Sequence, residues 1–449
     1  MTAWSGRWVA DRLHVTVRTT ATPAGVPVSD LVGLAVRRNA RRTHLLVSTV
    51  LGKHVPTDPR LVHAAGGMLG VLTAEALAGR VPDLPTGLKA LFRATLDGAP
   101  ADGLARAVRA HSGSCDALVF GYAETATALG HSVADTLRGA DYVHSTRRHV
   151  PGIASALTFE EEHSHATSHR VLPTNPYLLH GSRPLVLVDD ELSTGKTVLN
   201  TITALHRIAP RERYVVASLV DLRGAAERAG FDAAVRSLGV RVDVVSLAAG
   251  TVELPDDLTD RSAKVLTKAD SVAETEPAGP AGSVTALTDV DWPPSVPTSG
   301  RHGFTPAHRT ELEAMLPAWS KAVSTAMAPG DRVLVLGFEE LMYLPMRLAE
   351  ALADDHPDVT VRSSATTRSP VLAVPDEGYP IQHALVFPAH DGHDDAPRYA
   401  YNVRPPGSAP WDLIVQVVDT EGDTAQWRDG LLEALRPHTR RLLTVSVPA

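Results

Sequence analysis

The stretch Pro184-Leu-Val-Leu-Val-Asp-Asp-Glu-Leu-Ser-Thr-Gly-Lys-Thr197 decides the fold of this chain. It begins with four aliphatic residues, Leu185 to Val188, a run that is typical of a central strand in a parallel sheet buried on both faces. Asp189 and Asp190 follow at the carboxyl end of that strand. Ligands bind at this end of open α/β sheets, so we expect the two carboxylates to face a ligand.

The second half of the stretch has the composition of an anion-binding loop. Ser193, Thr194, Gly195, Lys196 and Thr197 offer hydroxyls, backbone N–H groups and a glycine that permits close backbone approach. They open a helical segment, and a helix N-terminus favours an anion. Carboxylates suited to hydroxyls, next to amides suited to phosphate, predict a sugar-phosphate site.

Three interpretations of the stretch compete. A Walker A nucleotide loop needs a glycine five residues before Gly195, but that position is Asp190. An ordinary strand-to-helix turn is disfavoured, because two adjacent acids rarely end a buried strand without a partner. The third is a resemblance to the phosphoribosyl-diphosphate motif of type I phosphoribosyltransferases, which has an apolar run, two acids, two variable residues and then Ser/Thr-x-Gly-x-Thr.

The resemblance implies the type I phosphoribosyltransferase fold, a twisted parallel sheet with helices on both faces and a mobile β-ribbon. It implies phosphoribosyl diphosphate as a substrate and Mg²⁺ as the cofactor. Asp189 and Asp190 would hold the ribose hydroxyls or waters on the Mg²⁺, and the loop from Ser193 to Thr197 would bind the 5-phosphate. Relatives acting on 6-oxopurines carry an acid where this chain has Ser193, so hypoxanthine and guanine are disfavoured as substrates.

Two earlier loops are similar to family loops. The β-rich run Leu45 to Val50 is followed by Leu51 and Gly52-Lys53-His54, which resemble the loop that meets the departing pyrophosphate. Asp116 to Gly121 is the next predicted strand, and the segment after it resembles the loop that contacts the base. In that segment Glu124 is a candidate to take a proton from an acceptor.

Relatives place a long β-ribbon over the active site, between that helix and the acidic strand. Arg147, Arg148, His163 and His165 fit the groups that such a ribbon brings to the pyrophosphate, and its closure would exclude water. A zinc site is an alternative, because His165 and His169 are four residues apart. The segment has the pattern of a ribbon and no cysteine joins it, so solvated histidines are favoured over zinc.

Composition places the chain among soluble enzymes. Its 449 residues, 44% of them hydrophobic, predict two or three domains with their own cores. Cys115 is the single cysteine, and we find neither a secretory signal nor an apolar run of membrane-spanning length, so we expect a cytoplasmic protein with no membrane partner. The net charge of −8 argues against general nucleic-acid binding.

One basic cluster, Arg37-Arg-Asn-Ala-Arg-Arg42, departs from this acidic balance. We expect it to end a helix capped by Ser29, where cations favour the helix dipole. An interface in a homodimer or a contact with a substrate phosphate is the alternative.

A Pro/Gly-rich linker at residues 268–306 separates a first domain, 1–267, from a second α/β domain, 307–449. We expect the linker part around Arg301-His-Gly-Phe304 to dock on a domain. The second domain contains the tetrad Thr367-Arg-Ser-Pro370, and the chain resembles phosphoribosyltransferases followed by a TRSP domain. That family is associated with tellurite-resistance-type gene clusters, which implies a role in making a nucleoside-like metabolite.

The two halves repeat a pattern. Gly121 to Glu124 aligns with Gly337 to Glu340, Ser145 to Arg148 with Thr366 to Ser369, and Leu185 to Asp190 with Val415 to Thr420. Our hypothesis is that the second domain is a degenerate duplicate that has lost its phosphate loop. Two unrelated α/β domains are the alternative, because short patterns recur widely.

If the duplicate has lost its substrate, Arg368, Ser369, Glu339 and Glu340 need another role. They could reach a second ligand, complete the first domain's site across a cleft, or form buried ion pairs.

The predicted activity is transfer of a 5-phosphoribosyl group from phosphoribosyl diphosphate to an unidentified acceptor. A sensor of that ligand without catalysis, or a hydrolase of phosphoribosyl compounds, would use the same residues.

Overall fold

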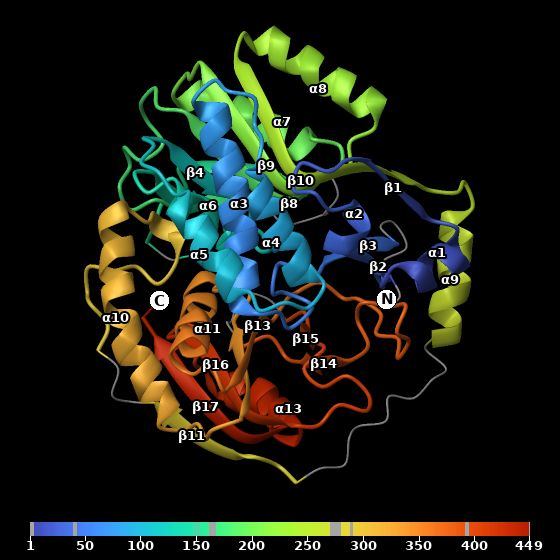
Figure 1. Cartoon of the computed structure of the whole chain (residues 1–449), viewed down its shortest axis with the longest axis vertical. Coiled ribbons are helices and arrows are strands. Elements are labelled where there is room, and N and C mark those ends of the chain that lie inside the picture. The colour runs from blue at the N-terminus through green and yellow to red at the C-terminus, as the bar shows by residue number, and fades with distance from the viewer. Residues whose placement is uncertain are drawn as a thin grey trace.

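The computed structural model describes residues 4–38, 43–148, 150, 152–160, 168–269, 280–287, 291–390 and 395–448. Two α/β units lie one above the other in Figure 1, the first coloured blue to green and the second orange to red. Each unit is built around its own sheet. The parallel α/β architecture predicted for both halves is confirmed.

The first sheet has six strands, with the acidic stretch near its middle. Their order across the sheet is β1 (Thr16–Ala21), β10 (Arg241–Glu253), β9 (Arg213–Asp221), β8 (Leu185–Leu192), β4 (Leu118–Gly121) and β5 (Asp141–His144). β1 pairs antiparallel with β10, and the other neighbours are parallel. The carboxyl ends of β4, β5 and β8 therefore meet at one edge of the sheet.

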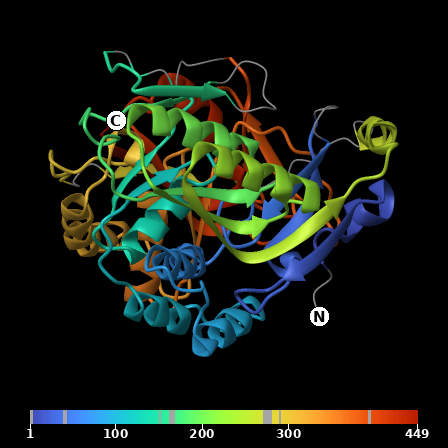
Figure 2. The same ribbon diagram turned by 90° about the horizontal axis from the view of Figure 1, so that it is seen from above.

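Strand β8 is buried on both faces, as its sequence predicts. Val186 and Val188 join the core that includes α3 (Pro59–Leu77) and α6 (Thr127–Thr136), beside which lie α4 (Thr86–Leu96) and α5 (Asp102–Ala110). Leu185 and Leu187 join the core under α7 (Lys196–Ile208) and α8 (Ala225–Leu238). Figure 2 shows α3 and the pair α7 and α8 on opposite sides of the sheet.

The N-terminal segment corrects one expectation. Ser29 lies in a one-turn helix, α2 (Val28–Leu31), and the chain then enters β2 (Val32–Val36), which pairs antiparallel with β3 (His44–Ser48). The prediction of a helix leading to the basic cluster is therefore wrong. The residues before the cluster form β2 instead, and all five of them are buried in the pairing with β3. Arg37 follows a buried strand. α1 (Arg7–Leu13) packs against β2, and α9 (Leu258–Ala269) packs against α1.

The predicted ribbon between β5 and β8 is present as an antiparallel pair, β6 (Leu157–Glu160) and β7 (Ser168–Val171). His163 and His165 lie outside the described residues. His169 is on β7, is buried, and its Nδ1 lies 2.9 Å from the Ser145 hydroxyl.

The second sheet has five parallel strands. Their order is β11 (Ser283–Leu287), β17 (Thr439–Val447), β16 (Trp411–Asp419), β12 (Arg332–Gly337) and β13 (Thr360–Ala365). Helices α10 (Pro306–Ser324) and α11 (Tyr343–Asp355) contribute to the core on one face. The other face is covered by the hairpin β14 (Ala384–Phe387) and β15 (Arg398–Tyr401), and by α12 (Ala425–Trp427), the π-helical turn η2 (Arg428–Leu432) and α13 (Glu433–Leu435), which the 3₁₀ turn η3 (Arg436–His438) joins to β17.

The segment predicted as a linker contributes structure to both halves. β11 supplies an edge strand of the second sheet, parallel to β17. Farther along, the turn η1 (Gly300–His302) leads to Phe304, which forms a bridge with Tyr142 at the edge of the first sheet. The docking expected for this part of the segment is therefore observed. The limits 1–267 and 307–449 stay a prediction.

The strand order expected for a duplication is found in both halves. In the first sheet β5-β4-β8-β9 are neighbours, and in the second β13-β12-β16-β17 are neighbours in the matching sequence order. The register differs by one residue from the alignment made from sequence. Phe120 pairs with Leu187 and Leu336 with Gln416, so counting forward places Asp419 at the position of Asp190.

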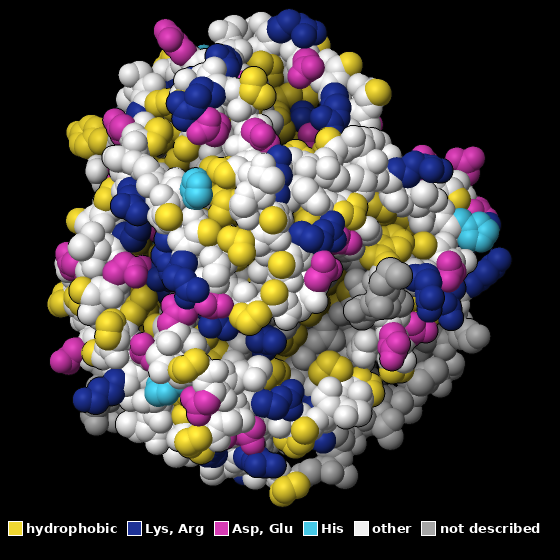
Figure 3. Space-filling model, viewed as in Figure 1, with side chains coloured by type: hydrophobic (Ala, Val, Ile, Leu, Met, Phe, Trp, Pro, Cys, Tyr) yellow, Lys and Arg dark blue, Asp and Glu magenta, His cyan; other side chains and the backbone are white. Residues whose placement is uncertain are grey.

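Helices from both halves bury apolar residues in one shared core. α11 of the second unit packs against α3 and α6 of the first. On the face shown in Figure 3, basic and acidic side chains are interspersed over both units. No helix in the described part of the chain is long and apolar enough to cross a membrane.

Candidate active site

A cavity of about 580 Å³ lies at the carboxyl ends of β4, β5 and β8. Ten of the residues predicted from the sequence line it: Lys53, His54, Glu124, Arg147, Asp189, Asp190, Ser193, Thr194, Gly195 and Thr197. Its size is in the range of small-molecule sites. The separated sequence motifs of the first domain therefore meet in one place.

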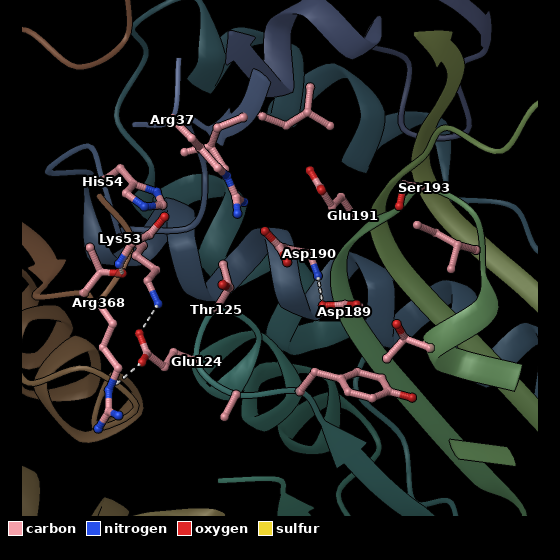
Figure 4. A pocket seen from close by; sticks show the side chains of 18 of the residues that line it. Arg37, Lys53, His54, Glu124, Thr125, Asp189, Asp190, Glu191, Ser193 and Arg368 are labelled. Carbon is pink, nitrogen blue, oxygen red and sulfur yellow. Dashed lines mark hydrogen bonds and ion pairs between the residues drawn. The ribbon is translucent and has the colours of Figure 1, made fainter. Parts of the chain in front are cut away.

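Asp189 and Asp190 lie on the last part of β8, where its side chains become half-buried. The Asp190 N–H donates to Asp189 Oδ1 at 3.0 Å, which fixes the first carboxylate against the backbone. Burial raises the pKa of the Asp190 carboxyl above its usual value. Two acidic groups thus face the cavity, as drawn in Figure 4.

The loop after β8 has a backbone conformation that favours glycine at position 195. Gly195 has φ +79° and is the N-cap of α7, and a Cβ placed on it would lie 2.8 Å from the Phe231 ring. A larger residue would be strained there. Lys196 begins the helix and, unlike its neighbours in the loop, is not among the cavity-lining residues. The loop presents the N-terminus of a 13-residue helix to the cavity.

Gly52, Lys53 and His54 follow the β2–β3 hairpin. Gly52 does not line the cavity; its φ is +64° and it packs between Val62 and the backbone of Ser363. Burial, and next to it the charge of Lys53, lowers the pKa of His54 to about 3, so this imidazole is neutral at pH 7. The loop therefore presents one cation, Lys53.

Glu124 lies between two cations, one from each unit. Lys53 Nζ is 3.3 Å from Glu124 Oε2, and Arg368 Nε is 3.2 Å from Glu124 Oε1 (Figure 4). Burial alone would raise the pKa of Glu124, but Lys53 and the nearby arginines lower it below the usual value. A carboxylate held in this way is a weak base, so the geometry favours an ion-pairing role over the proton acceptance expected from the sequence.

The two arginines predicted for the ribbon lie on opposite sides of the chain after β5. Arg147 lines the cavity. Arg148 is buried in the second unit instead, where Nη1 donates to Asp419 Oδ2 at 2.7 Å and the guanidinium lies 4.5 Å from the centre of the Phe338 ring. The two residues lie in a bend after β5, where the Arg148 N–H donates to the Thr146 hydroxyl at 3.0 Å, and their side chains diverge from this bend.

Several lining residues were not predicted as site residues. From the first unit these are Leu45, Leu46, Tyr122, Ala123, Thr125, Glu191, Leu192 and Val198. Arg37, for which a contact with a substrate phosphate was the alternative to a helix end, lines the cavity as well. The tetrad Thr367 to Pro370, which the sequence assigns to the second domain, also lines the cavity. Of the roles considered for Arg368, a contribution to the first site and an ion pair are both observed, the latter with Glu339 at 2.8 Å.

The acidic pair suits a hard metal ion. Asp189 and Asp190 offer carboxylate oxygens, which Mg²⁺ prefers. Among the residues that the structure describes, no three His, Cys, Asp or Glu side chains converge as a metal site. The donor set therefore fits a Mg²⁺ that takes further oxygens from a substrate.

Comparison with known proteins supports the resemblance in both halves. Residues 31–251 match the family model described as phosphoribosyl transferase, and residues 298–435 match the model of the TRSP domain C-terminal to it. No curated protein matches the chain.

Solved structures of adenine phosphoribosyltransferases are similar to part of the chain. The Trypanosoma brucei protein, in complex with AMP, pyrophosphate and ribose-5-phosphate, is 19% identical over 30% of this chain, with a TM-score of 0.23. The match spans 56% of that protein's length. The Giardia lamblia protein complexed with 9-deazaadenine is 15% identical over 50% of this chain and 97% of its own, and the Rhodothermus marinus protein is 15% identical over 49% and 96%, both with a TM-score of 0.27.

The two family models follow one another in the order predicted from the sequence and together match about four fifths of the chain. The chain therefore belongs to the phosphoribosyl transferase family in which that domain is followed by a TRSP domain.

Proposed function

We propose that this protein transfers a 5-phosphoribosyl group from phosphoribosyl diphosphate to a nucleophilic acceptor. The observation that carries the proposal is the convergence of the acidic pair, the loop capping α7 and Lys53 around one cavity. Each group suits a different part of this substrate, namely the ribose hydroxyls, the 5-phosphate and the pyrophosphate. Family membership supports the same reaction class.

In the proposed reaction the bond between the ribose C1 and a pyrophosphate oxygen breaks. Pyrophosphate leaves with the electron pair, the acceptor forms the new bond to C1, and the acceptor loses a proton. Backbone N–H groups of the loop from Ser193 to Thr197 would donate to the 5-phosphate. Asp189 and Asp190 would accept hydrogen bonds from the ribose 2- and 3-hydroxyls and so fix the ring.

Lys53 and Arg147 would meet the leaving pyrophosphate with positive charge. Mg²⁺ bound with the substrate near Asp189 and Asp190 would offset further negative charge on that group. Catalysis would thus come mainly from positioning and electrostatics, with neutral His54 as a hydrogen-bonding group only.

The acceptor would enter on the side of the β2–β3 hairpin. There Leu45 and Leu46 form an apolar wall, and Arg37 adds a cation. Ser193, in the loop after β8, offers no acid to the acceptor. These features fit a flat, partly polar acceptor other than a 6-oxopurine, in line with a nucleoside-like product.

The experiment that tests this function is titration calorimetry with phosphoribosyl diphosphate and Mg²⁺, followed by a pyrophosphate-release assay against bases, amines and nucleoside-like acceptors. We expect binding, and release that depends on an acceptor. Release at the same rate in buffer alone would replace the transferase with a hydrolase. Binding with no release from the whole panel would favour a sensor, and no binding would overturn the site.

A further inference from the structure

The second unit repeats the first at the level of single hydrogen bonds. After β4, the N–H of Ala123 donates to the Ser145 hydroxyl at 3.0 Å; after β12, the N–H of Glu339 donates to the Thr366 hydroxyl at 3.0 Å. Ala123 and Glu339 each lie two residues beyond the last glycine of their strand. The side-chain acceptor lies in each case on the residue after the neighbouring strand, β5 or β13.

The agreement extends to the next turn and to the ribbon. Arg148 N–H donates to the Thr146 hydroxyl at 3.0 Å, and Ser369 N–H donates to the Thr367 hydroxyl at 3.2 Å. Thr146 bridges to Arg170 of β7, as Thr367 bridges to Tyr399 of β15. By this correspondence Arg368 occupies in the second unit the position that Arg147 occupies in the first.

The ligand end of the second sheet, however, is filled. Asp419, which corresponds to Asp190, pairs with Arg148 at 2.7 Å and with Arg301 at 3.7 Å, and its Oδ1 accepts the Gly422 N–H at 2.9 Å. Thr424 replaces Gly195 as the residue that caps the following helix, which is three residues long. The group that fills this end, Arg148, comes from the first unit.

The second unit in turn contributes residues to the site of the first unit. Arg368 lines the cavity beside Lys53. Ser364 donates its hydroxyl hydrogen to the backbone oxygen of Lys53 at 2.8 Å, and the Asn402 amide donates to the backbone oxygen of His54 at 2.9 Å. These two hydrogen bonds from the second unit therefore hold the backbone of the Lys53 loop.

We infer that the second unit serves as a built-in partner subunit, in which Arg368 binds the pyrophosphate end of phosphoribosyl diphosphate together with Lys53. This inference rests on the proposed function. Arg368 and Lys53 approach the two oxygens of the single Glu124 carboxylate within 3.2 and 3.3 Å, so both cations already reach one anionic group. A diphosphate offers the same kind of oxygens with more charge, and a planar guanidinium can bind two of them at once.

The test compares Arg368→Gln and Arg368→Lys with the wild type, and uses Arg362→Gln as a matched control. Arg362 lies on β13, does not line the cavity, and has its Nη1 3.8 Å from Asp58 Oδ2. We expect Arg368→Gln to weaken binding of pyrophosphate and of phosphoribosyl diphosphate by about 10- to 100-fold, with Arg368→Lys intermediate. Binding of ribose-5-phosphate should stay within about twofold, because that ligand has no diphosphate.

A second variant covers the case in which Arg368→Gln does not fold. Ser364→Ala removes the hydrogen bond to the Lys53 backbone and should raise the KM for phosphoribosyl diphosphate more than it lowers kcat. Ser320→Ala, another buried serine of the second unit, is its control, and should change neither constant.

The outcomes separate the two proposals. If the wild type binds phosphoribosyl diphosphate and Arg368→Gln binds it and pyrophosphate equally well, the inference is overturned while the proposed function stands. Equal losses for pyrophosphate and ribose-5-phosphate would also overturn it, because they would indicate a general structural role. If the wild type itself fails to bind, the proposed function falls first.

Discussion

The ends of the two central strands, β8 and β16, show how one scaffold can be an open site or a filled one. Both strands carry an aspartate near the carboxyl end at the same register position, Asp190 or Asp419. Asp190 faces a cavity beside the Gly195 loop, which also lines it, whereas Asp419 is 2% exposed and paired with Arg148. The difference teaches that strand order does not create a binding site; the residues that follow the strands determine whether the space stays open.

The largest expected effect comes from making the same change at both ends. Asp190→Asn should lower turnover by roughly 100-fold or more, because it removes a charge that meets the substrate in the proposed reaction, and should leave the melting temperature nearly unchanged. Asp419→Asn should instead lower the melting temperature and leave the turnover of the folded protein nearly unchanged. It leaves Arg148 buried without its main partner, at a cost of about 3–5 kcal/mol of unfolding free energy.

Turnover and urea unfolding of both variants measure this contrast. Asp116→Asn, an exposed change just before β4, is the control and should alter neither quantity. A stable Asp419→Asn protein would show that the second end is not closed by its ion pairs.

A smaller effect is expected from lowering the pH, which should affect the carboxyl ends of the two sheets at different pH values. Burial raises the pKa of Asp190, so its carboxylate is protonated at a higher pH than an ordinary aspartate. Burial would also raise the pKa of Glu340, but Arg301 and Arg148 bring it below its usual range. Its stabilising ion pair is present above the unfolded pKa near 4.5 and is lost only as pH falls well below that value.

Lowering the pH toward about 4.5 should therefore weaken phosphoribosyl diphosphate binding before the units loosen. Calorimetric affinity and near-ultraviolet circular dichroism, followed over the same pH series, test the order. Simultaneous loss of both signals would mean that the two ends are not electrostatically distinct.

A further effect concerns the contact between the units at α3, α6 and α11. His63 Nε2 lies 2.9 Å from Asp135 and its Nδ1 2.7 Å from Glu350. Burial alone would lower the pKa of His63, but Glu350 and then the hydrogen bond to Asp135 raise it from 6.5 to about 9, even with Arg347 opposing. The stabilisation is full below pH 6.5 and is lost as pH rises toward 9.

Unfolding free energy should thus fall by up to about 1.4 kcal/mol per pH unit in this window. His63→Gln should flatten the dependence, whereas His111→Gln, on the exposed C-cap of α5, should not. An unchanged slope in His63→Gln would place the pH dependence elsewhere in the molecule.

The smallest expected effect is at the two helix caps. The Thr424 hydroxyl accepts the Trp427 N–H at 3.2 Å, so Thr424→Ala should cost about 1 kcal/mol of stability with no loss of ligand affinity. At the equivalent cap, Gly195→Ala should weaken ribose-5-phosphate binding, because the Cβ meets Phe231. Thermal unfolding and calorimetry of the pair would refute the correspondence if the two variants behaved alike.

The parts of the site that are continuous in sequence could be predicted, and the parts assembled by packing could not. The stretch from Leu185 to Thr197 carries its strand, acids and glycine together, so local pattern was enough. Arg37 was assigned to a helix end because pairing of β2 with β3 is not visible in either strand alone. Arg147 and Arg148 are adjacent in sequence, and only the second unit's position shows that they face different sites.

The tetrad from Thr367 to Pro370 illustrates the same limit at longer range. Its residues mark a family, but their position beside Lys53 depends on how two sheets pack across more than 300 residues of chain. No periodic pattern in the sequence predicts that these two segments lie side by side.

The joining of two similar folds in one polypeptide also bears on how such a protein can change over time. In a dimer of identical subunits, any mutation that closes one site closes both, and any arginine donated to a neighbour is donated in both directions. Here the corresponding positions Arg147 and Arg368, or Gly195 and Thr424, are separate codons. One half could therefore give up its own ligand and specialise as a support, while the other kept its glycine and its open acids.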